Sequence, residues 1–330
     1  MATYPIWQDR SVSIPNGNLF RISGGTGPNG ESGTFYQGLA VAPASGSGGN
    51  AAVFYNRICA ARMLYGAPSF SSNTKTAVCT AQSFTIQRSA DDGATWTTVA
   101  TVSFRPDWSY LSDSNAVKSR PINDHFHPQM RLFFSVIEWS INTTQAWYDV
   151  GNGHVNTSYS QMNVAAGTTA TYVIPNTAAK SVGIGTLTWR TPRPCAPGAL
   201  YYRNAFGGWD SFLIEGAIVP VEDTQRWTRR IAINNSGLPG TVLRGEQNYV
   251  NETTHRWTLT TGGMTDAQAR AFAQHILPSG DVWLHIFDGD TIVPVIIDTA
   301  QQEVRSYKTN GRRPVTFSLD CHLAQERISM

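Results

Sequence analysis

The chain has little charge. Only 15% of its 330 residues are Asp, Glu, Lys or Arg, compared with about 25% in an average globular protein. The net charge of +2 at pH 7 creates no strong field to attract nucleic acid. A surface poor in charge and rich in aromatic residues is typical of protein interfaces. We therefore expect protein partners to cover much of this surface, and no nucleic acid among them.

Long hydrophobic runs are also missing. No segment approaches the roughly 18 consecutive apolar residues of a membrane-spanning helix. The first ten residues, MATYPIWQDR, contain no apolar stretch of the kind that a signal peptide needs. We expect no membrane insertion and folding in a cytoplasm.

Cysteine is scarce, and its spacing is wide. The chain has four cysteines, none in a Cys-x-x-Cys pair: Cys59, Cys79, Cys195 and Cys321. Zinc sites use more closely spaced ligands. We expect buried free thiols that behave as small hydrophobic side chains.

Signatures of catalysis are missing as well. The chain has no G-x-S-x-G turn and no G-x-x-x-x-G-K-[ST] phosphate loop. Acidic pairs such as Asp91-Asp92 lie in turns, which Asp favours, although hydrolysis by carboxylates far apart in sequence stays open. His125 and His127 would share one face of a strand, but a third metal ligand is missing, so we prefer a polar turn before Pro128. We expect no enzyme, no metal and no cofactor.

What the sequence does contain is typical of a β-protein. Hydrophobic residues make up 41%, with 29 Gly, 10 Trp and 12 Tyr. A chain of this length exceeds the size at which one core usually stops growing. We predict a mainly β fold of two antiparallel β-sandwich-like domains, residues 1–170 and 171–330, the second with one packed α-helix.

The predicted helix covers about residues 265–277. Thr265 is the expected N-cap, and Gln268 three residues later completes a capping box. Pro278 ends the helix because proline cannot continue the hydrogen-bond ladder. The residues expected on its apolar face are Ala267, Ala271, Phe272 and Ile276.

A hairpin turn in the first half matches the Asp-box pattern S-x-D-x-G-x-T-W. The pattern residues are Ser89, Asp91, Gly93, Thr95 and Trp96. The Ser and Asp side chains are expected to bond the backbone of the turn, the glycine to take a positive φ, and the tryptophan to pack under the hairpin. Asp-boxes resemble those of sialidase propellers, but a propeller needs one in each blade and this chain has one. We therefore predict a structural turn rather than a sialidase.

A second motif, N-x-F-G-G-W-D-x-F, lies in the second half. Its residues are Asn204, Phe206, Gly207, Gly208, Trp209, Asp210 and Phe212. Two adjacent glycines permit a tight turn that aromatic side chains cover, which could also be an ordinary aromatic corner of a core. The string resembles one that recurs in virion structural proteins of tailed bacteriophages, especially those of Bacteroidetes hosts. There a strand reading like WLN leads into LGGWD; here Tyr-Arg-Asn precedes the glycines, and Ala-Phe replaces the commoner hydrophobic pair.

The resemblance extends from about residue 186 to the C-terminus. The capped helix, the strands VWLHIF and IVPVIID, a Lys/Arg-rich turn and the strand PVTFSLDCHLA resemble the end of tail proteins. It implies a class of assembly protein and no catalytic residues. We expect a non-enzymatic structural subunit of a virion, in the tail, baseplate or neck, assembled in the host cytoplasm. Its expected partners are copies of itself and other virion proteins, with contacts through loops near 23–33, 43–50 and 191–198.

A carbohydrate-binding or adhesin module for host attachment is the alternative. Exposed Trp and Tyr rings stack on sugars, and the chain has many of both. A host surface glycan would then be a partner.

Overall fold

Strands dominate the computed structural model, which describes residues 3–26, 32–41, 49–63, 67–71, 73–78, 80–107, 118–151, 160–230, 246–299, 315–324 and 328–329. The mainly β fold with antiparallel sheets predicted from the sequence is confirmed. Among the described residues, no helix has the length and apolarity to cross a membrane.

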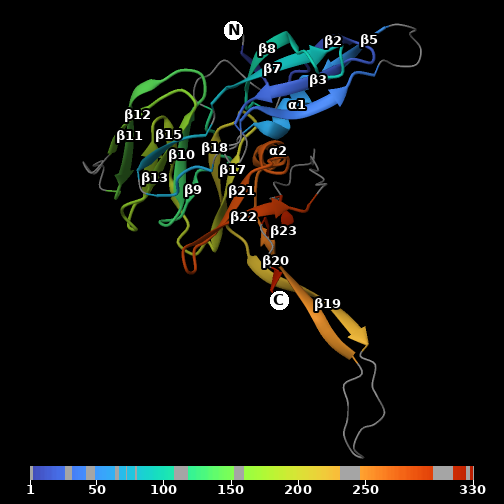
Figure 1. Ribbon diagram of the computed structural model, residues 1–330. Helices are drawn as coiled ribbons and strands as arrows, with labels where there is room; N and C mark the ends of the chain where they lie inside the picture. Colours follow the sequence, from blue (N-terminus) through green and yellow to red (C-terminus); the bar gives the residue numbers. More distant parts are fainter. Residues whose placement is uncertain are drawn as a thin grey trace, which may run out of the picture.

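The N-terminal part is built on a five-stranded sheet, at the upper end of Figure 1. Its strand order is β1 (Thr3–Pro5), β8 (Thr97–Arg105), β7 (Gln82–Ser89), β3 (Leu19–Gly24) and β4 (Thr34–Leu39). A hairpin-like pair, β2 (Ser11–Pro15) with β5 (Asn50–Phe54), and helix α1 (Tyr55–Arg62) pack on it. Alternate side chains such as Ile22, Phe84 and Phe104 fill this core.

Helix α1 was not predicted. Its N-cap position is Phe54, which provides no side-chain cap, and its first turn contains no acidic residue. The helix therefore has no start signal in the sequence. Cys59 on α1 is buried among the apolar side chains of the core, so packing rather than a cap stabilises this helix.

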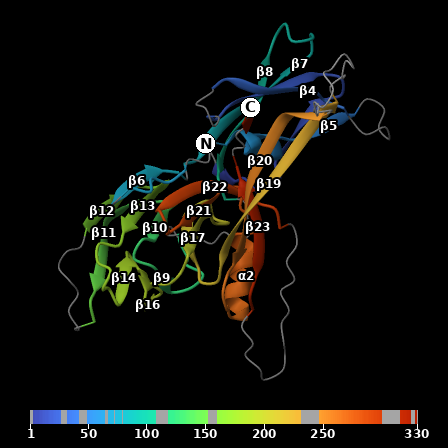
Figure 2. The same ribbon diagram turned by 90° about the horizontal axis from the view of Figure 1, so that it is seen from below.

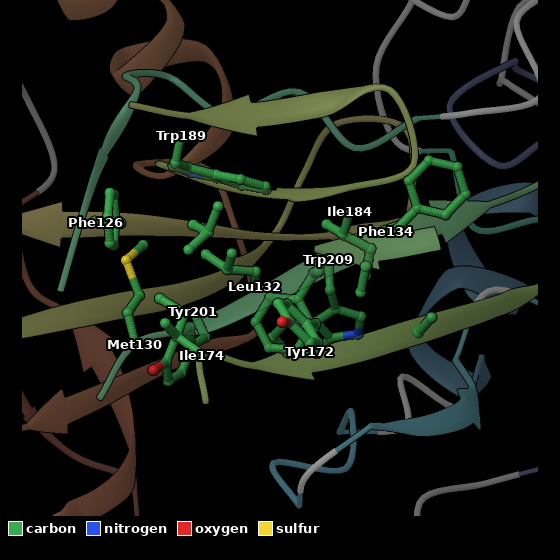
Figure 3. Packing of buried hydrophobic residues seen from close by; sticks show 14 of the residues in the cluster. Phe126, Met130, Leu132, Phe134, Tyr172, Ile174, Ile184, Trp189, Tyr201 and Trp209 are labelled. Carbon is green, nitrogen blue, oxygen red and sulfur yellow. The ribbon is translucent and has the colours of Figure 1, made fainter. Parts of the chain in front are cut away.

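The central part is a sandwich of two small sheets. One has the order β10 (Arg131–Val136), β13 (Thr168–Val173) and β6 (Thr74–Ala77). The other has the order β12 (Ser160–Val164), β11 (Ile141–Asp149), β14 (Ser181–Ile184) and β15 (Leu187–Trp189). A short parallel pair, β9 (His125–Phe126) with β16 (Thr191–Pro192), lies beside them. Figure 3 shows the core between these strands, where Leu132, Tyr172 and Trp189 meet.

An eight-stranded sheet forms the C-terminal part. Its strands are β18 (Trp209–Ile214), β17 (Gly198–Arg203), β21 (Val282–Ile286), β22 (Thr291–Ile297), β23 (Ser318–Leu323), β20 (Glu246–Thr260) and β19 (Ile218–Arg230), with β24 (Ile328–Ser329) on β20. Along β17, Tyr201 faces the central sandwich, whereas Leu200 and Tyr202 face helix α2 (Asp266–His275). The sheet is thus covered on both faces at its β17–β18 end.

Helix α2 confirms the predicted capping box. The Thr265 hydroxyl accepts from the Gln268 amide, and the Gln268 side chain accepts from the Thr265 amide at 2.9 Å. Its buried face differs from the predicted one, because Ala269 is buried while Ala267 is exposed. A stripe through Ala269, Phe272 and Ile276 follows the helical spacing better.

The boundary expected at residue 170 falls inside strand β13. The core around β13 contains side chains from both sides of that position, including Phe133 and Trp209. The three core clusters centre instead on the N-terminal sheet, the central sandwich and the α2 face of the large sheet.

Candidate functional site

The Asp-box forms the predicted turn between β7 and β8. The Gly93 amide donates to the Ser89 hydroxyl at 2.8 Å, and the Thr95 amide donates to Asp91 Oδ1 at 2.9 Å. Gly93 has a φ of +93°, which a glycine adopts without strain. Hydrogen bonds from Ser89 and Thr95 lower the pKa of Asp91 to about 2. Both Asp91 carboxylate oxygens are used inside the turn, so this residue acts as a structural brace.

Trp96 lies at the end of the Asp-box and is half-buried. The Arg21 guanidinium stacks over its ring, with its carbon 4.3 Å from the ring centroid. The ring thus shields the hairpin from one side rather than filling a core, which lowers the expected cost of removing it.

The second motif forms the tight turn between β17 and β18, and Asn204 organises it. Its side-chain oxygen accepts from the Phe206 amide at 3.0 Å and from the Gly208 amide at 3.1 Å. Its side-chain nitrogen donates to the Lys118 carbonyl and to Asp210 Oδ2, each at 2.8 Å. One buried amide therefore closes the turn and ties it to the distant segment at residue 118.

The two glycines of this turn allow other segments to approach. Gly207 has a φ of +85°, and a Cβ there would lie 2.9 Å from the Pro106 ring. A Cβ on Gly208 would lie 2.8 Å from the Ser135 Cβ on β10. The turn therefore sits where the end of the N-terminal part meets the central sandwich.

Trp209 continues this junction into the core. It is fully buried, its amide donates to the Ser135 hydroxyl at 3.0 Å, and its carbonyl accepts from Ser119 at 3.2 Å. In Figure 3 its indole lies beside Tyr172. Three residues further along β18 comes Phe212, which faces α2 and packs edge-on against Phe272.

Asp210 is a buried carboxyl within the same network. It accepts from Asn204 and from the Arg120 amide, the latter at 3.1 Å. Burial is the main cause that raises its pKa to about 7, against the hydrogen bonds that favour the ionised form. Because every residue of this motif from Asn204 to Phe212 is buried, the motif shapes the fold and offers no surface to a partner.

The longest strands that the structure describes, β19 and β20, form a two-stranded arm. Strands β19 and β20 pair antiparallel from Ile218 opposite Leu259 to Arg230 opposite Glu246. Figure 1 shows this ribbon leaving the body and running well beyond it, and Figure 2 shows its two strands side by side from below. β23 pairs with β20 only from Arg256 to Thr260, and further out the short β24 is the one other described strand that pairs with the arm. The arm is therefore long, and the chain's described residues leave most of it uncovered.

One face of the arm carries apolar side chains in water. Val219, Val221 and Trp227 share this face, because strand residues alternate with a period of two, and they are 49%, 43% and 41% exposed. Arg256 lies directly opposite Val221 and connects through His322 to the exposed Ile296 on β22. Two polar side chains, Arg256 and His322, thus separate the apolar face of the arm from Ile296 on the large sheet.

The opposite face of the arm borders a cavity of about 510 Å³ at its base. Ile218, Pro220 and Trp257 form one wall, and the segment 194–197 forms another. Polar groups at the cavity come from residues His127, Gln129 and Asp288. Cys195 also lines it and is exposed, so the expectation of a buried thiol is wrong for this residue, while Cys59 and Cys321 are buried as expected. Cys79 lies outside the described residues.

The two histidines weighed as metal ligands have other partners. His125 lies in strand β9 rather than in a turn, and its Nδ1 contacts the Glu215 carboxylate. His127 stacks on the Phe287 ring at 4.0 Å, and its Nδ1 accepts from the Gln129 amide. Within the described ranges, no cluster of three or more His, Cys, Asp or Glu is arranged to hold a metal ion.

Sequence reasoning missed the arm. Its strands carry charged and polar residues among the apolar ones, so they lack the clean alternation of a strand with one buried face. The signal that was available is the content of β-branched and aromatic residues in Ile218–Arg230 and Glu246–Thr260. Of the loops expected to make contacts, residues 27–31 and 43–48 lie outside the described residues, and residues 194–197 of the spacer at 191–198 line the cavity.

No family model, curated protein or solved structure matches the chain.

Proposed function

We propose that the protein is a non-enzymatic structural subunit of a bacteriophage virion, in the tail, baseplate or neck, that binds neighbouring virion proteins through its β19–β20 arm. The single observation that carries this proposal is the arm with its exposed apolar face. The resemblance of the N-x-F-G-G-W-D-x-F string to tailed-phage proteins supports the choice of particle.

The energetics of the arm support a partner. An isolated two-stranded ribbon is marginally stable in water because it buries little apolar surface. Val219, Val221 and Trp227 leave that surface open on one face of this ribbon. Covering three such side chains would contribute on the order of 2–4 kcal/mol, at about 25 cal/mol per Å². An arm that reaches beyond its own body is best explained by a neighbouring subunit on which it rests.

The placement of the two motifs supports an architectural role. Asp91 uses its oxygens to brace a turn, and Asp210 is buried at the junction of three segments. Neither carboxyl lines the cavity at the base of the arm. The motif residues are therefore better suited to fixing the shape of a subunit than to catalysis.

The cavity at the base of the arm favours a second candidate function, binding of a host glycan. Trp257 offers part of an indole face, and Gln129 and Asp288 supply polar groups at the same cavity. Sugar-binding sites typically combine an aromatic ring with such polar groups. Binding of the purified protein to a glycan array, lost in Trp257→Ala and kept in Trp139→Ala, would support it. Trp139 is the matched control because it is exposed and does not line the cavity.

The proposed function is tested by mass spectrometry of purified phage particles that encode this chain. The expected result is a fixed copy number per particle that is a multiple of three or six, as in rings of the tail and baseplate. Absence of the chain from intact particles would overturn the proposal.

A further inference from the structure

Strand β4 ends the N-terminal sheet, and no strand among the described residues pairs with its outer edge. Among the described strands it pairs with β3 alone. The Ala40 amide donates to the Asn18 carbonyl at 2.9 Å, and the Ala40 carbonyl accepts from Gly17 at 2.9 Å, so both Ala40 groups point toward β3. Because these groups alternate along an antiparallel strand, the amide and carbonyl of Leu39 and Gln37 point away from the sheet.

This edge lacks the features that keep sheet edges from pairing. From Thr34 to Val41 the chain has no charged residue and no proline. The edge strand β19 is different, because it carries Pro220, Glu222 and Arg226. Charge and proline on an edge oppose the addition of another strand.

The side chains around β4 are also apolar and exposed. Tyr36 is 39% exposed, Leu39 is 56% exposed and Val41, just past the strand, is 69% exposed. An uncharged edge with exposed apolar side chains is a surface for strand addition.

We propose that β4 pairs antiparallel with β4 of a second copy of this chain, so that the two five-stranded sheets become one continuous sheet. A two-fold axis at Gly38 would place Gln37 of one copy opposite Leu39 of the other. The outward amides and carbonyls of both residues would then be satisfied in both copies.

The chemistry of the edge favours a second copy as the partner. Directly opposed like charges destabilise a strand pair, and β4 has none to oppose. Gly38 at the axis brings no side chain into the contact. The surface is therefore self-complementary, as an interface with two-fold symmetry requires.

This contact goes beyond the proposed function, because it needs neither the arm nor another virion protein. The N-terminal sheet and the arm lie at opposite ends of the molecule (Figure 1), so one surface can be changed without touching the other.

The test is the mass of the purified chain in solution at micromolar concentration, measured by light scattering and sedimentation equilibrium. The variant Gln37→Pro removes an outward-facing amide without removing a hydrogen bond to β3, at an edge position where proline is tolerated. We expect a dimer for the wild type and for the control Gln37→Thr, which keeps the amide, and a monomer for Gln37→Pro. Hydrogen exchange should show the Leu39 amide exchanging roughly tenfold faster in Gln37→Pro, while the Ala40 amide stays slow in both.

A second variant, Leu39→Lys, guards against misfolding in the first, because its side chain is exposed and a lysine there puts a charge on the edge. It should also be monomeric. A monomeric wild type, or a dimer that survives both Gln37→Pro and Leu39→Lys, would overturn the proposal. Either result leaves the role of the arm intact, since both variants retain it.

Discussion

The two ends of the eight-stranded sheet are used in opposite ways. At one end every residue of β18 is buried, because β10 and the central sandwich cover one face and α2 covers the other. At the other end, every described side chain of β19 from Val219 to Trp227 is exposed. The same sheet is thus a core element where the chain folds back on it and a projecting ribbon where it does not.

This difference shows where sequence changes should act. Around β18, Asn204 donates to the Lys118 carbonyl and the Trp209 amide donates to the Ser135 hydroxyl. These bonds connect segments far apart in sequence, so a change there should damage folding. Along β19, apolar side chains contribute little to the chain's own core, so a change there should spare folding and damage assembly. The four predictions below test this division, starting with the largest expected effect on stability.

The turn between β17 and β18 should tolerate no side chain at its glycines. In Gly207→Val, strain at a φ of +85° adds to a clash with Pro106, and in Gly208→Val the clash is with Ser135. We expect a loss of about 3–5 kcal/mol of stability, enough to remove most of the soluble protein. Thermal unfolding and soluble yield measure it.

The control for this prediction is Gly280→Ala. A Cβ added at Gly280 would meet no other atom within 4 Å, and the φ of this residue is not positive. The melting temperature of Gly280→Ala should therefore stay close to that of the wild type. Normal yield and stability of both valine variants would break the comparison between the two ends of the sheet.

Asp210 should make the stability of the buried end depend on pH. Its pKa is raised to about 7 in the folded state, above the unfolded value near 4. Its favourable contribution is therefore fully present below about pH 4 and is lost as the pH rises through 7, on the order of 2–4 kcal/mol. Because asparagine cannot ionise, Asp210→Asn should lose less stability than the wild type as the pH rises from 4 to 8.

Denaturant unfolding gives the free energy of unfolding of the wild type and of Asp210→Asn at each pH between 4 and 8. The difference between the two proteins is the contribution of Asp210. The difference is needed because burial also raises the pKa of Asp107, to about 6. Parallel stability curves for the two proteins would contradict the burial of an ionisable Asp210.

The sequence predicted the elements with strong local signals. The Thr265–Gln268 capping box and strands within VWLHIF, IVPVIID and PVTFSLDCHLA were found as expected. Each depends on neighbours in sequence, through capping, turn geometry or the period of two.

What the sequence could not predict depends on distant contacts. The network that joins Asn204 to Lys118 crosses 86 residues, and nothing near either residue announces it. The arm was missed for the opposite reason, because its strands lack a covered face and so lack the pattern that a core imposes. The Asn204 network and the arm thus lie at the two opposite ends of the large sheet, and neither has a local signal in the sequence.

The Asp-box hairpin should show an intermediate effect. Trp96 is half-buried and stacks with Arg21, so Trp96→Ala should lower stability by about 1–2 kcal/mol, less than for a fully buried tryptophan. Trp209→Ala in the core is the matched comparison and should cost about 3–5 kcal/mol. Equal melting temperatures for Trp96→Ala and Trp209→Ala would contradict the assignment of Trp96 to the surface and Trp209 to the core.

The arm should show the smallest effect on stability and the largest on assembly. In the triple variant Val219→Ser, Val221→Ser and Trp227→Ser, the changed side chains are exposed, so each substitution should alter stability by no more than about 0.5 kcal/mol. A matched control is Trp139→Ser, which removes an exposed tryptophan at another place.

The most direct measurement of the central claim is incorporation of these two variants into phage particles, quantified by mass spectrometry beside their melting temperatures. We predict that the triple arm variant melts like the wild type and drops at least roughly tenfold in copies per particle, as expected when buried anchors of an interface are lost. The Trp139→Ser control should be incorporated normally. Wild-type incorporation of the triple arm variant would contradict the claim that the arm joins this protein to its neighbours.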